Sequence, residues 1–416
     1  MPPIPEPSRH RPELLAPAGN ETCLTAAIQG GCDAVYLGLG TLNMRATAEN
    51  FSVSDLGRVA ETCHAQGVSV YVTANTILYT AETPSARTLI EACRGVVDAV
   101  ICWDPALIGI CRELGVPFHV STQASVANVE AARFYKQLGA ERIIPARECT
   151  LEDITRIRNE ADIPVEVFAH GAMCVSVSGR CFLSQFTYGH SGNRGRCYQN
   201  CRREFHIVSD DGDAELAVGS NYVLSAKDLC TLPFVDRLLD AGVDALKLEG
   251  RNRNPEYVRT VVGAYRRAID AWDNGQLTED LKTQLVEETR TVYNRDFSAG
   301  FFLGRPIAEF ASVNGSAATV RKQHVGVVRD YYRKAGAVEM KVQNYIFGQG
   351  DTLMIQGPTT GVVTFTAEEI RQNDVRVDTV TRGIATVGLQ SLVRENDKVF
   401  RLEGNAPPED HVETGD

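Results

Sequence analysis

Four cysteines lie close together near the middle of the chain. They follow the pattern C-x6-C-x15-C-x3-C and are Cys174, Cys181, Cys197 and Cys201. Four thiolates at this density predict a metal ion or an iron-sulfur cluster. Structural zinc sites favour cysteine pairs about two to four residues apart, whereas iron-sulfur sites accept more varied spacing. The cluster is therefore the favoured interpretation, zinc is its rival, and Cys230 is an alternative to Cys201 as the fourth ligand.

Small residues surround these cysteines in the stretches GAMCVSVSGRC and GNRGRCYQNC. Glycine and serine let a loop wrap a cluster and bring backbone amides close to its sulfurs. The alternative is that the thiols are buried structural residues, because free cysteine is common in protein cores. That alternative is preferred for the remaining cysteines on apolar helix faces and near one strand end, which are Cys23, Cys63, Cys93, Cys111 and Cys149.

The cysteine segment and the residues after the last predicted strand are rich in arginine. These arginines are Arg180, Arg194, Arg196, Arg202, Arg203, Arg251 and Arg253. Such a patch can bind the phosphates of a nucleic acid, bind a carboxylate substrate, or balance the negative charge of a thiolate-bound cluster. The sequence leaves these three roles open.

Polar side chains also recur at the carboxyl ends of the predicted strands. They are Asn75, Gln123, Arg147, Glu148, His170, Lys247, Glu249 and Arg251. In a barrel of parallel strands this end carries the active site, so the side chains are predicted to converge on one pocket. His170 fits an acid or base and a hydrogen-bonded support residue equally well. The simpler alternative for any one of them is a solvated loop residue or, for Glu249 with Arg251, an ordinary ion pair.

A repeated pattern indicates how these residues are positioned. The stretches GCDAVYLG, VVDAVICW and GVDALKLE each join a turn to a short apolar run, which is typical of a helix, a turn and a buried parallel strand. Eight strands are predicted, at 13–17, 33–38, 69–75, 98–103, 117–122, 142–147, 165–170 and 244–249. Their alternation with helices predicts an α/β fold with a TIM-like (β/α)8 barrel. An open doubly wound sheet is the alternative, but no GxGxxG follows the first strand.

The domain boundaries follow from breaks in this rhythm. Residues 1–12 are predicted to be a disordered N-terminus and 13–310 the barrel, with a Cys-rich insertion at 171–230 before the last strand. Long excursions in compact domains usually carry function. Short β-type runs separated by Gly, Asp and Asn then predict a small all-β barrel at 320–404, followed by a disordered tail at 405–416.

Composition limits the partners and the compartment. The 416-residue chain has a formal net charge of -11, so nucleic acid would have to bind through a local basic patch and not through bulk charge. No segment is long and apolar enough to predict a membrane span. The N-terminal stretch MPPIPEPSRHRPE has prolines and charges where a secretory signal needs apolar residues, so a cytoplasmic location is expected.

Four stretches together resemble one known family. ELLAPAGN, EVFAHGAMCVSVSGRC, NRGRCYQNCRREF and ALKLEGRNRNPEYV occur in the order expected for the U32 family of collagenase-like peptidases, across residues 12–275. The β-rich tail is similar to the C-terminal domain of longer members. The resemblance implies an oxygen-sensitive 4Fe-4S cluster and hydroxylation without molecular oxygen, with prephenate as the oxygen donor.

The same resemblance implies substrates and residue roles. It is strongest to the branch that forms 5-hydroxyuridine at the tRNA wobble position, and a ribosomal RNA cytidine or a ubiquinone precursor is the alternative target. The clustered cysteines would hold the cluster, and Cys230 stays in view because the last ligand lies further along the chain in the ubiquinone branch. Arg147 and Arg251 could bind the carboxylates of the donor, and His170 could order or protonate the oxygen in transit. The arginine patch would bind the anticodon arm, and the need for a partner protein and the oligomeric state stay open.

Two hypotheses from other classes remain. A peptidase would need a catalytic constellation such as a Cys174–His170 pair, since the chain has no HExxH and no GxSxG. A non-enzymatic protein would use the cluster as a structural staple. A radical mechanism based on S-adenosylmethionine is disfavoured, because no CxxxCxxC stretch is present.

Overall fold

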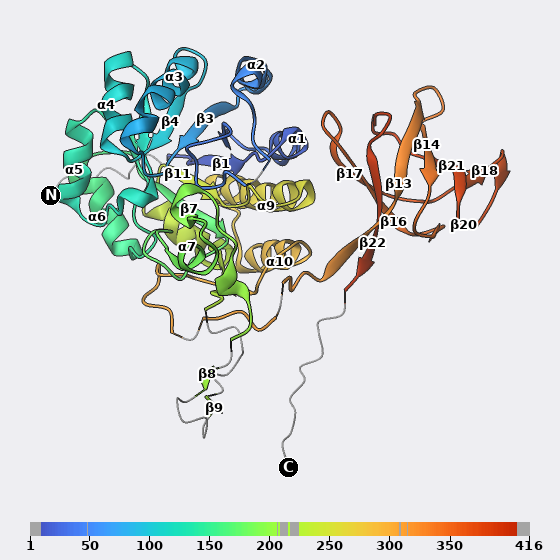
Figure 1. The fold of residues 1–416 in the computed structure, drawn as a ribbon. Coiled ribbons are helices and arrows are strands. Elements are labelled where there is room, and N and C mark those ends of the chain that lie inside the picture. Colours follow the sequence, from blue (N-terminus) through green and yellow to red (C-terminus); the bar gives the residue numbers. More distant parts are fainter. Residues whose placement is uncertain are drawn as a thin grey trace.

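The computed structural model describes residues 10–405, apart from 48, 206, 209–214, 217–223, 308 and 314. Disorder was predicted for both chain ends. Residues 1–9 and 406–416, which make up most of these two ends, lie outside the described residues. The described chain forms an α/β domain with a curled sheet and, beside it, an all-β domain (Figure 1).

All eight predicted strands form in the α/β domain. They are β1 Glu13–Pro17, β2 Ala34–Gly38, β3 Ser69–Ala74, β4 Ala99–Cys102, β5 Phe118–Val120, β6 Arg142–Ile143, β7 Glu166–Gly171 and β11 Ala245–Leu248. They are parallel neighbours in the order β7, β11, β1, β2, β3, β4, β5, β6. A parallel bridge between Ile143 and Val165 connects β6 to the start of β7. This consecutive order is that of a TIM-like sheet and not of a doubly wound one, whose strand order reverses.

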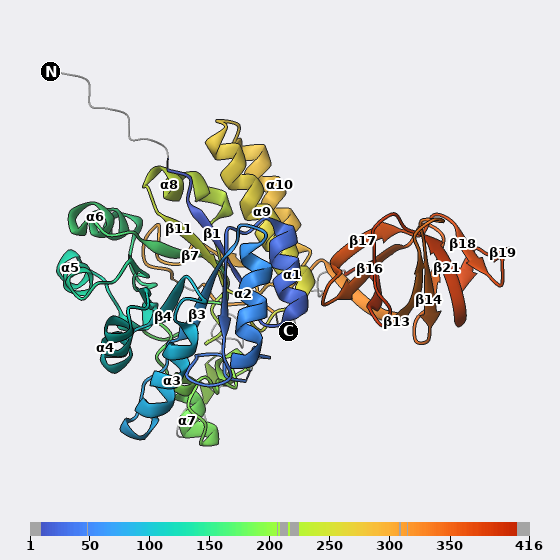
Figure 2. The same cartoon turned by 90° about the horizontal axis from the view of Figure 1, so that it is seen from above.

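Helices surround the curled sheet (Figure 2). They are α1 Glu21–Gly30, α2 Leu56–His64, α3 Thr83–Cys93, α4 Pro105–Leu114, α5 Val129–Gln137, α6 Leu151–Ala161, α8 Val235–Asp240, α9 Pro255–Asp273 and α10 Glu279–Arg290. Their apolar faces pack on fully buried strands such as β2 and β4 and form one core. The four cysteines predicted on apolar helix faces are buried in α1 to α4. None of the described helices combines the length and apolarity that a bilayer span needs.

Local sequence signals determine where several helices begin and end. The side chain of Asn20 accepts a hydrogen bond from the backbone N–H of Cys23 and caps α1, and Thr150 forms a capping box with Asp153 at α6. At the other end of α1, Gly31 adopts a left-handed conformation with φ of 84°, which glycine enters without steric cost. These signals keep the turns short, so the strand ends stay fixed relative to the helices.

The long connection between β7 and β11 departs from the βα rhythm. It contains α7 Leu183–Tyr188, a hairpin of β8 Ile207–Val208 and β9 Glu215–Leu216, and β10 Asp228–Cys230. β10 runs antiparallel to the carboxyl end of β7, and β12 Phe297–Ser298 pairs with β10, so the sheet has ten strands. The sequence prediction missed β10 and β12, because two or three residues carry no readable periodicity.

The C-terminal domain is all-β, as predicted. Its strands are β13 Val320–Tyr332, β14 Ala337–Val342, β15 Phe347–Gly348, β16 Thr352–Gly357, β17 Gly361–Thr366, β18 Ile370–Gln372, β19 Val375–Arg376, β20 Thr379–Val380, β21 Gly383–Gly388 and β22 Lys398–Gly404. Eight of them form one sheet in the order β17, β16, β22, β13, β14, β21, β18, β19, and β15 pairs with β20. Among the described pairings none joins β17 to β19, so a closed barrel stays a prediction.

The all-β domain packs against α1 and α9 of the barrel (Figure 2). Gln29 Nε2 donates to the carbonyl of Thr360 at 2.8 Å, and Lys322 forms an ion pair of 2.7 Å with Glu256. Met354 and Val362 of the β domain join the core of the α/β domain. The two domains are therefore in packed contact and are not joined by a linker alone.

Candidate active site

A cavity lies at the carboxyl ends of the barrel strands. Inward-facing strand residues, including Tyr36 and Phe168, line one part of it, and the β7–β11 connection lines another. Of the predicted polar residues, the structure brings six into this cavity, namely Asn75, Gln123, Arg147, Lys247, Glu249 and Arg251. Glu148 instead accepts hydrogen bonds from the backbone and side chain of Ser178 and so fixes the neighbouring loop.

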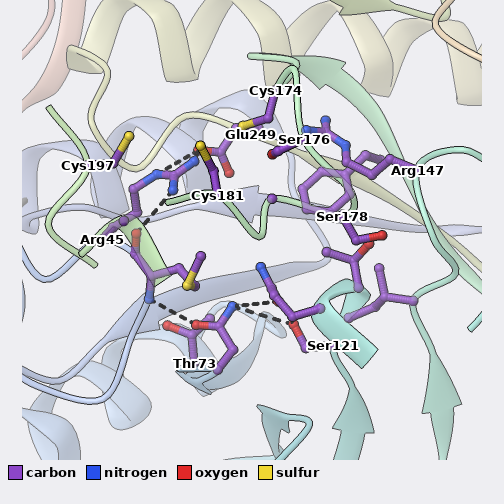
Figure 3. A pocket seen from close by; sticks show the side chains of 18 of the residues that line it. Arg45, Thr73, Ser121, Arg147, Cys174, Ser176, Ser178, Cys181, Cys197 and Glu249 are labelled. Atoms are coloured by element: carbon purple, nitrogen blue, oxygen red, sulfur yellow. Dashed lines mark hydrogen bonds and ion pairs between the residues drawn. The ribbon is translucent and has the colours of Figure 1, made fainter. Parts of the chain in front are cut away.

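An ion pair between Arg45 and Glu249 forms part of the cavity wall (Figure 3). Nη2 and Nε of Arg45 lie 2.8 and 3.2 Å from the same carboxylate oxygen, and Tyr36 donates its hydroxyl to the other at 3.2 Å. Burial tends to raise the pKa of Glu249, but the charges of Arg45 and Arg251 outweigh it and lower the pKa to about 2. Glu249 is therefore ionised at neutral pH and serves as an acceptor and charge anchor, not as a proton donor.

Arg251 follows β11 and reaches to strand β3 and to the loop after β2. Its guanidinium donates to Thr73 Oγ1 at 3.2 Å and to Asn43 Oδ1 at 2.9 Å. Burial lowers its pKa to about 10, which still leaves it charged at neutral pH. The approach requires glycine at position 38, because a Cβ there would lie 2.3 Å from Arg251 Nη1. The glycine at this position of β2 therefore leaves room for a buried, charged guanidinium in the cavity wall.

Arg147 differs from Arg251 because part of its guanidinium lacks a protein acceptor. Its charged group lies over the Phe168 ring at 4.3 Å, and Nη1 donates to the carbonyl of Ala172 at 2.8 Å. Nε and Nη2 are buried and have no hydrogen-bond partner among the described residues. Buried donors are rarely left unpaired, and Arg147 lines the cavity, so these two N–H groups are the candidate donors to a ligand acceptor.

Amide and hydroxyl groups line the opposite end of the cavity in the view of Figure 3. Asn75 Nδ2 donates to Gln123 Oε1 at 3.3 Å and to Ser121 Oγ at 3.4 Å. Its oxygen accepts from the backbone N–H of Met44 at 3.1 Å, which fixes the orientation of the amide. Groups of this kind hydrogen-bond the edge of a polar ring without adding charge.

The clustered cysteines also line this cavity, and they are Cys174, Cys181, Cys197 and Cys201. Figure 3 shows the first three at the end of the cavity that holds Arg45 and Glu249. Burial raises the pKa of the Cys201 thiol, and the neighbouring Arg202 opposes that shift. In the part of the chain that the structure describes, no three His, Cys, Asp or Glu side chains stand in a ready-made metal geometry. The donor set fits a thiolate-bound group, and the loops would have to draw the sulfurs inward to hold it.

His170 and Cys230 lie outside this cavity lining. His170 is buried, and its ring packs against Tyr265 and Phe297 at centroid distances of 5.7 and 5.3 Å. Cys230 lies opposite His170 in the β7–β10 pairing and is buried as well. The geometry therefore matches the support interpretation of His170, and it separates Cys230 from the four clustered cysteines.

The buried imidazole predicts an acid-sensitive fold. Burial lowers the pKa of His170 from 6.5 to about 4, with Arg253 acting in the same direction and Asp228 against it. Between these values the unfolded chain binds a proton that the folded chain does not, so stability is complete above pH 6.5 and is lost as the pH falls. For this reason the free energy of unfolding of the wild type should fall by about 3 kcal/mol between pH 7 and pH 4, and His170→Gln should lack this fall. Denaturant unfolding of both proteins across this pH range measures the difference. An identical pH profile in the variant would contradict the assignment.

Comparison with known proteins identifies the family. The sequence profile of Peptidase family U32 matches residues 19–311. The chain belongs to this family. It is 38% identical over 405 residues to "Collagenase" of Porphyromonas gingivalis, covering 94% of this chain and 98% of that protein. It is 33% identical over 371 residues to "tRNA hydroxylation protein P1" of Bacillus subtilis, covering 88% of each, and 30% identical over 412 residues to "tRNA hydroxylation protein P" of Escherichia coli, covering 86% and 89%.

Two charged or polar residues of this U32 cavity, Arg45 and Tyr36, were not predicted from the sequence. Arg45 lies in the irregular stretch TLNMRAT, where no periodicity points to a site. Tyr36 lies in the apolar run of β2, and its hydroxyl contacts Glu249. Only the alternation of β2, which turns Tyr36 toward the barrel interior, could have drawn attention to it.

The structure also divides the arginine patch of this U32 protein. Arg194 donates to the carbonyl of Ile77 and pairs with Glu82. Arg202 donates to the carbonyls of Met173 and Ala226. These two arginines brace the loops that carry the cysteines. Arg180, Arg196 and Arg203 are exposed and lie nearer to the surface.

Proposed function

We propose that this protein is an iron-sulfur-dependent RNA hydroxylase that works without molecular oxygen, forms 5-hydroxyuridine at the tRNA wobble position and takes the oxygen from prephenate. One observation carries the proposal: four cysteines and the unpaired N–H groups of Arg147 line the same cavity. The names of two U32 relatives, both tRNA hydroxylation proteins, support RNA hydroxylation as the reaction class.

A 4Fe-4S cluster would be held by the four clustered cysteines, and when bound it supplies one-electron redox chemistry. The surrounding protein contributes charge. Glu249 raises the pKa of Arg45 and burial lowers the pKa of Arg147, and a negative charge on Cys174 acts upward on both. Cationic groups beside thiolates favour their deprotonated form, which is the form that binds metal. These arginines would therefore help to load the site and to offset its negative charge.

The oxygen donor would be held by arginine. Prephenate is a dicarboxylate, and a planar guanidinium binds a carboxylate through two parallel hydrogen bonds. Arg147 has Nε and Nη2 free of protein acceptors among the described residues, which is the pair of donors such a contact uses. Arg251 contributes charge from the other side of the cavity, although Thr73 and Asn43 already accept from it. We assign the primary contact to Arg147.

The RNA base would enter the same cavity from a single-stranded loop. An anticodon loop presents unstacked bases at low cost, and the amides of Asn75 and Gln123 can hydrogen-bond the edge of such a base. Ribosomal RNA and a ubiquinone precursor are the alternative targets within the same chemistry, and a cytoplasmic location is part of the proposal. A peptidase based on Cys174 and His170 is not favoured, because His170 does not line the cavity into which Cys174 faces.

A deletion strain complemented with variants tests the function. Mass spectrometry of nucleosides should show 5-hydroxyuridine absent from tRNA of the deletion strain and restored by the wild-type gene. Arg147→Lys keeps the charge but loses the two-donor geometry, so we expect about 10- to 100-fold lower kcat/KM for the donor. Arg87→Lys, at an exposed ion pair with Glu113, is the matched control and should restore the modification fully. Unchanged tRNA in the deletion strain, with altered ribosomal RNA or quinone instead, would refute the tRNA assignment.

A further inference from the structure

The surface next to the cysteine loops exposes several aromatic rings. Phe182 is 62%, Phe186 87% and Tyr198 52% exposed. Tyr188, at the end of α7, is also exposed. Folded proteins bury most of their large aromatic side chains, so rings gathered on one small surface indicate an interaction site. We call the four residues Phe182, Phe186, Tyr188 and Tyr198 the aromatic platform.

The platform consists of two ring pairs. Phe182 directly precedes α7 and Phe186 lies within it, with ring centroids 6.1 Å apart, and Tyr188 packs against Tyr198 at 5.5 Å. Arg203 lies over the Tyr188 ring at 5.5 Å. The rings of each pair are tilted, by 59° and 57°, so neither pair closes into a face-to-face stack. His190 also packs against Tyr198 at 5.4 Å, so the two phenylalanines, which are the most exposed of the four rings, offer the most surface to a flat partner.

Charge identifies the class of partner. The segment 171–205 contains five arginines and one acidic residue, within a chain whose net charge is -11. Arg194 and Arg202 are used inside the protein, whereas Arg180, Arg196 and Arg203 of the same segment are exposed. Of these, Arg203 lies over the Tyr188 ring, and Arg180 also donates to Ser125 Oγ at 2.9 Å. A surface of exposed aromatic rings with interleaved arginines is complementary to single-stranded nucleic acid, whose bases stack and whose phosphates pair with guanidinium groups.

The platform is continuous with the cavity. Phe182 lies between Cys181 and Leu183 in the chain, and both of these neighbours line the cavity. Tyr198 directly follows Cys197, which lines it too. Adjacent Cα atoms are about 3.8 Å apart, so the rings stand at the rim of the cavity. A polynucleotide that places one base inside must pass its flanking nucleotides over this rim.

We propose that the aromatic platform binds the unpaired nucleotides that flank the target base, by stacking them on Phe182, Phe186, Tyr188 and Tyr198. The proposal rests on the proposed RNA hydroxylase function and adds the surface that selects single-stranded over paired RNA. Stacking accepts any base, so the platform supplies affinity and the cavity supplies the choice of base. The exposed arginines contribute the salt-dependent part of binding.

Binding of a labelled RNA hairpin to the anaerobically purified protein tests the platform. The double variant Phe182→Ala/Phe186→Ala should bind the hairpin loop about 10- to 100-fold more weakly than wild type, with an unchanged salt dependence, because no charge is removed. Arg180→Ala/Arg196→Ala should instead reduce the slope of affinity against salt concentration. Phe134→Ala removes a ring that is 56% exposed on α5 and serves as the matched control, with unchanged binding. Iron content and circular dichroism establish that each variant is folded and loaded.

Several outcomes would overturn the platform. The first is a Phe182→Ala/Phe186→Ala variant that binds the hairpin as tightly as wild type. The second is a wild-type protein that binds the hairpin loop and the same RNA annealed to its complement with equal affinity. The third is a double variant that no longer forms a protein oligomer but keeps its RNA affinity. Failure of the hydroxylase function looks different, because tRNA of the deletion strain would be unaltered while the double variant still loses hairpin binding. Conversely, normal hydroxylation with an unchanged KM for RNA in that variant would refute the platform alone.

Discussion

Serine in place of Cys197 is expected to abolish iron binding. Cys197 lines the cavity together with the other clustered cysteines, and a serine hydroxyl does not supply a thiolate ligand. Wild-type protein purified without oxygen should contain about four irons and four acid-labile sulfides per chain, as a cubane cluster requires. The variant should contain almost none and should lose the visible absorption of the cluster. Zinc measured on the same samples tests the rival metal.

Two control variants separate the cluster ligands from structural cysteines. Cys149→Ser changes a buried thiol that donates to the carbonyl of Val126 at 3.9 Å, and the variant should keep its iron. Cys201→Ser and Cys230→Ser form the decisive pair, because Cys201 lines the cavity and Cys230 is buried in β10. We expect iron loss only in the former. Retained iron in Cys197→Ser or Cys201→Ser, or one zinc per chain without sulfide in the wild type, would contradict the cluster.

Removal of the Glu249 carboxylate is expected to destabilise the fold strongly. Arg45 would lose its carboxylate partner in a cavity wall that also holds Arg147 and Arg251. Breaking a fully buried ion pair by deleting one member costs about 3 to 5 kcal/mol, because the other charge stays without compensation. The side chains of Arg45 and Glu249 are 27% and 13% exposed, so we expect a loss at the lower end of this range, about 3 kcal/mol. The free energy of unfolding of Glu249→Ala, measured by denaturant titration at neutral pH, should fall by that amount. Glu113→Ala, which breaks an exposed pair with Arg87, should change it very little.

A second substitution tests this explanation. Arg45→Met removes the unpaired charge, so Arg45→Met/Glu249→Ala should recover much of the lost stability. The pH dependence gives an independent check. The pKa of Glu249 is lowered from 4.5 to about 2, so its contribution to stability is present above pH 4.5 and is lost as the pH falls toward 2. A Glu249→Ala protein as stable as wild type, or a double variant less stable than the single one, would refute the charge argument.

Local sequence determined the framework of this protein. The barrel strands are short apolar runs, and those after β1 follow amphipathic stretches. Both signals lie within a few residues, so all eight strands could be predicted. The carboxyl ends of parallel strands meet at one edge, which is why Asn75, Gln123 and Arg147 could be expected to converge. The spacing of the cysteines was likewise a local signal.

The tertiary structure decided which of these residues face the cavity and how they are paired. Arg45 and Glu249 are separated by 204 positions, and no local pattern connects them. His170 is the last but one residue of β7 and belongs to the same sequence block as Cys174. The unpredicted strand β10 pairs beside it, and aromatic rings bury it away from the cavity lining. Periodicity reports which side of an element is apolar, whereas partners far along the chain are selected by packing. The sequence by itself therefore determined the TIM-like framework and the chemistry of its side chains. The packing alone determined which charges are compensated and which buried N–H groups have no partner among the described residues.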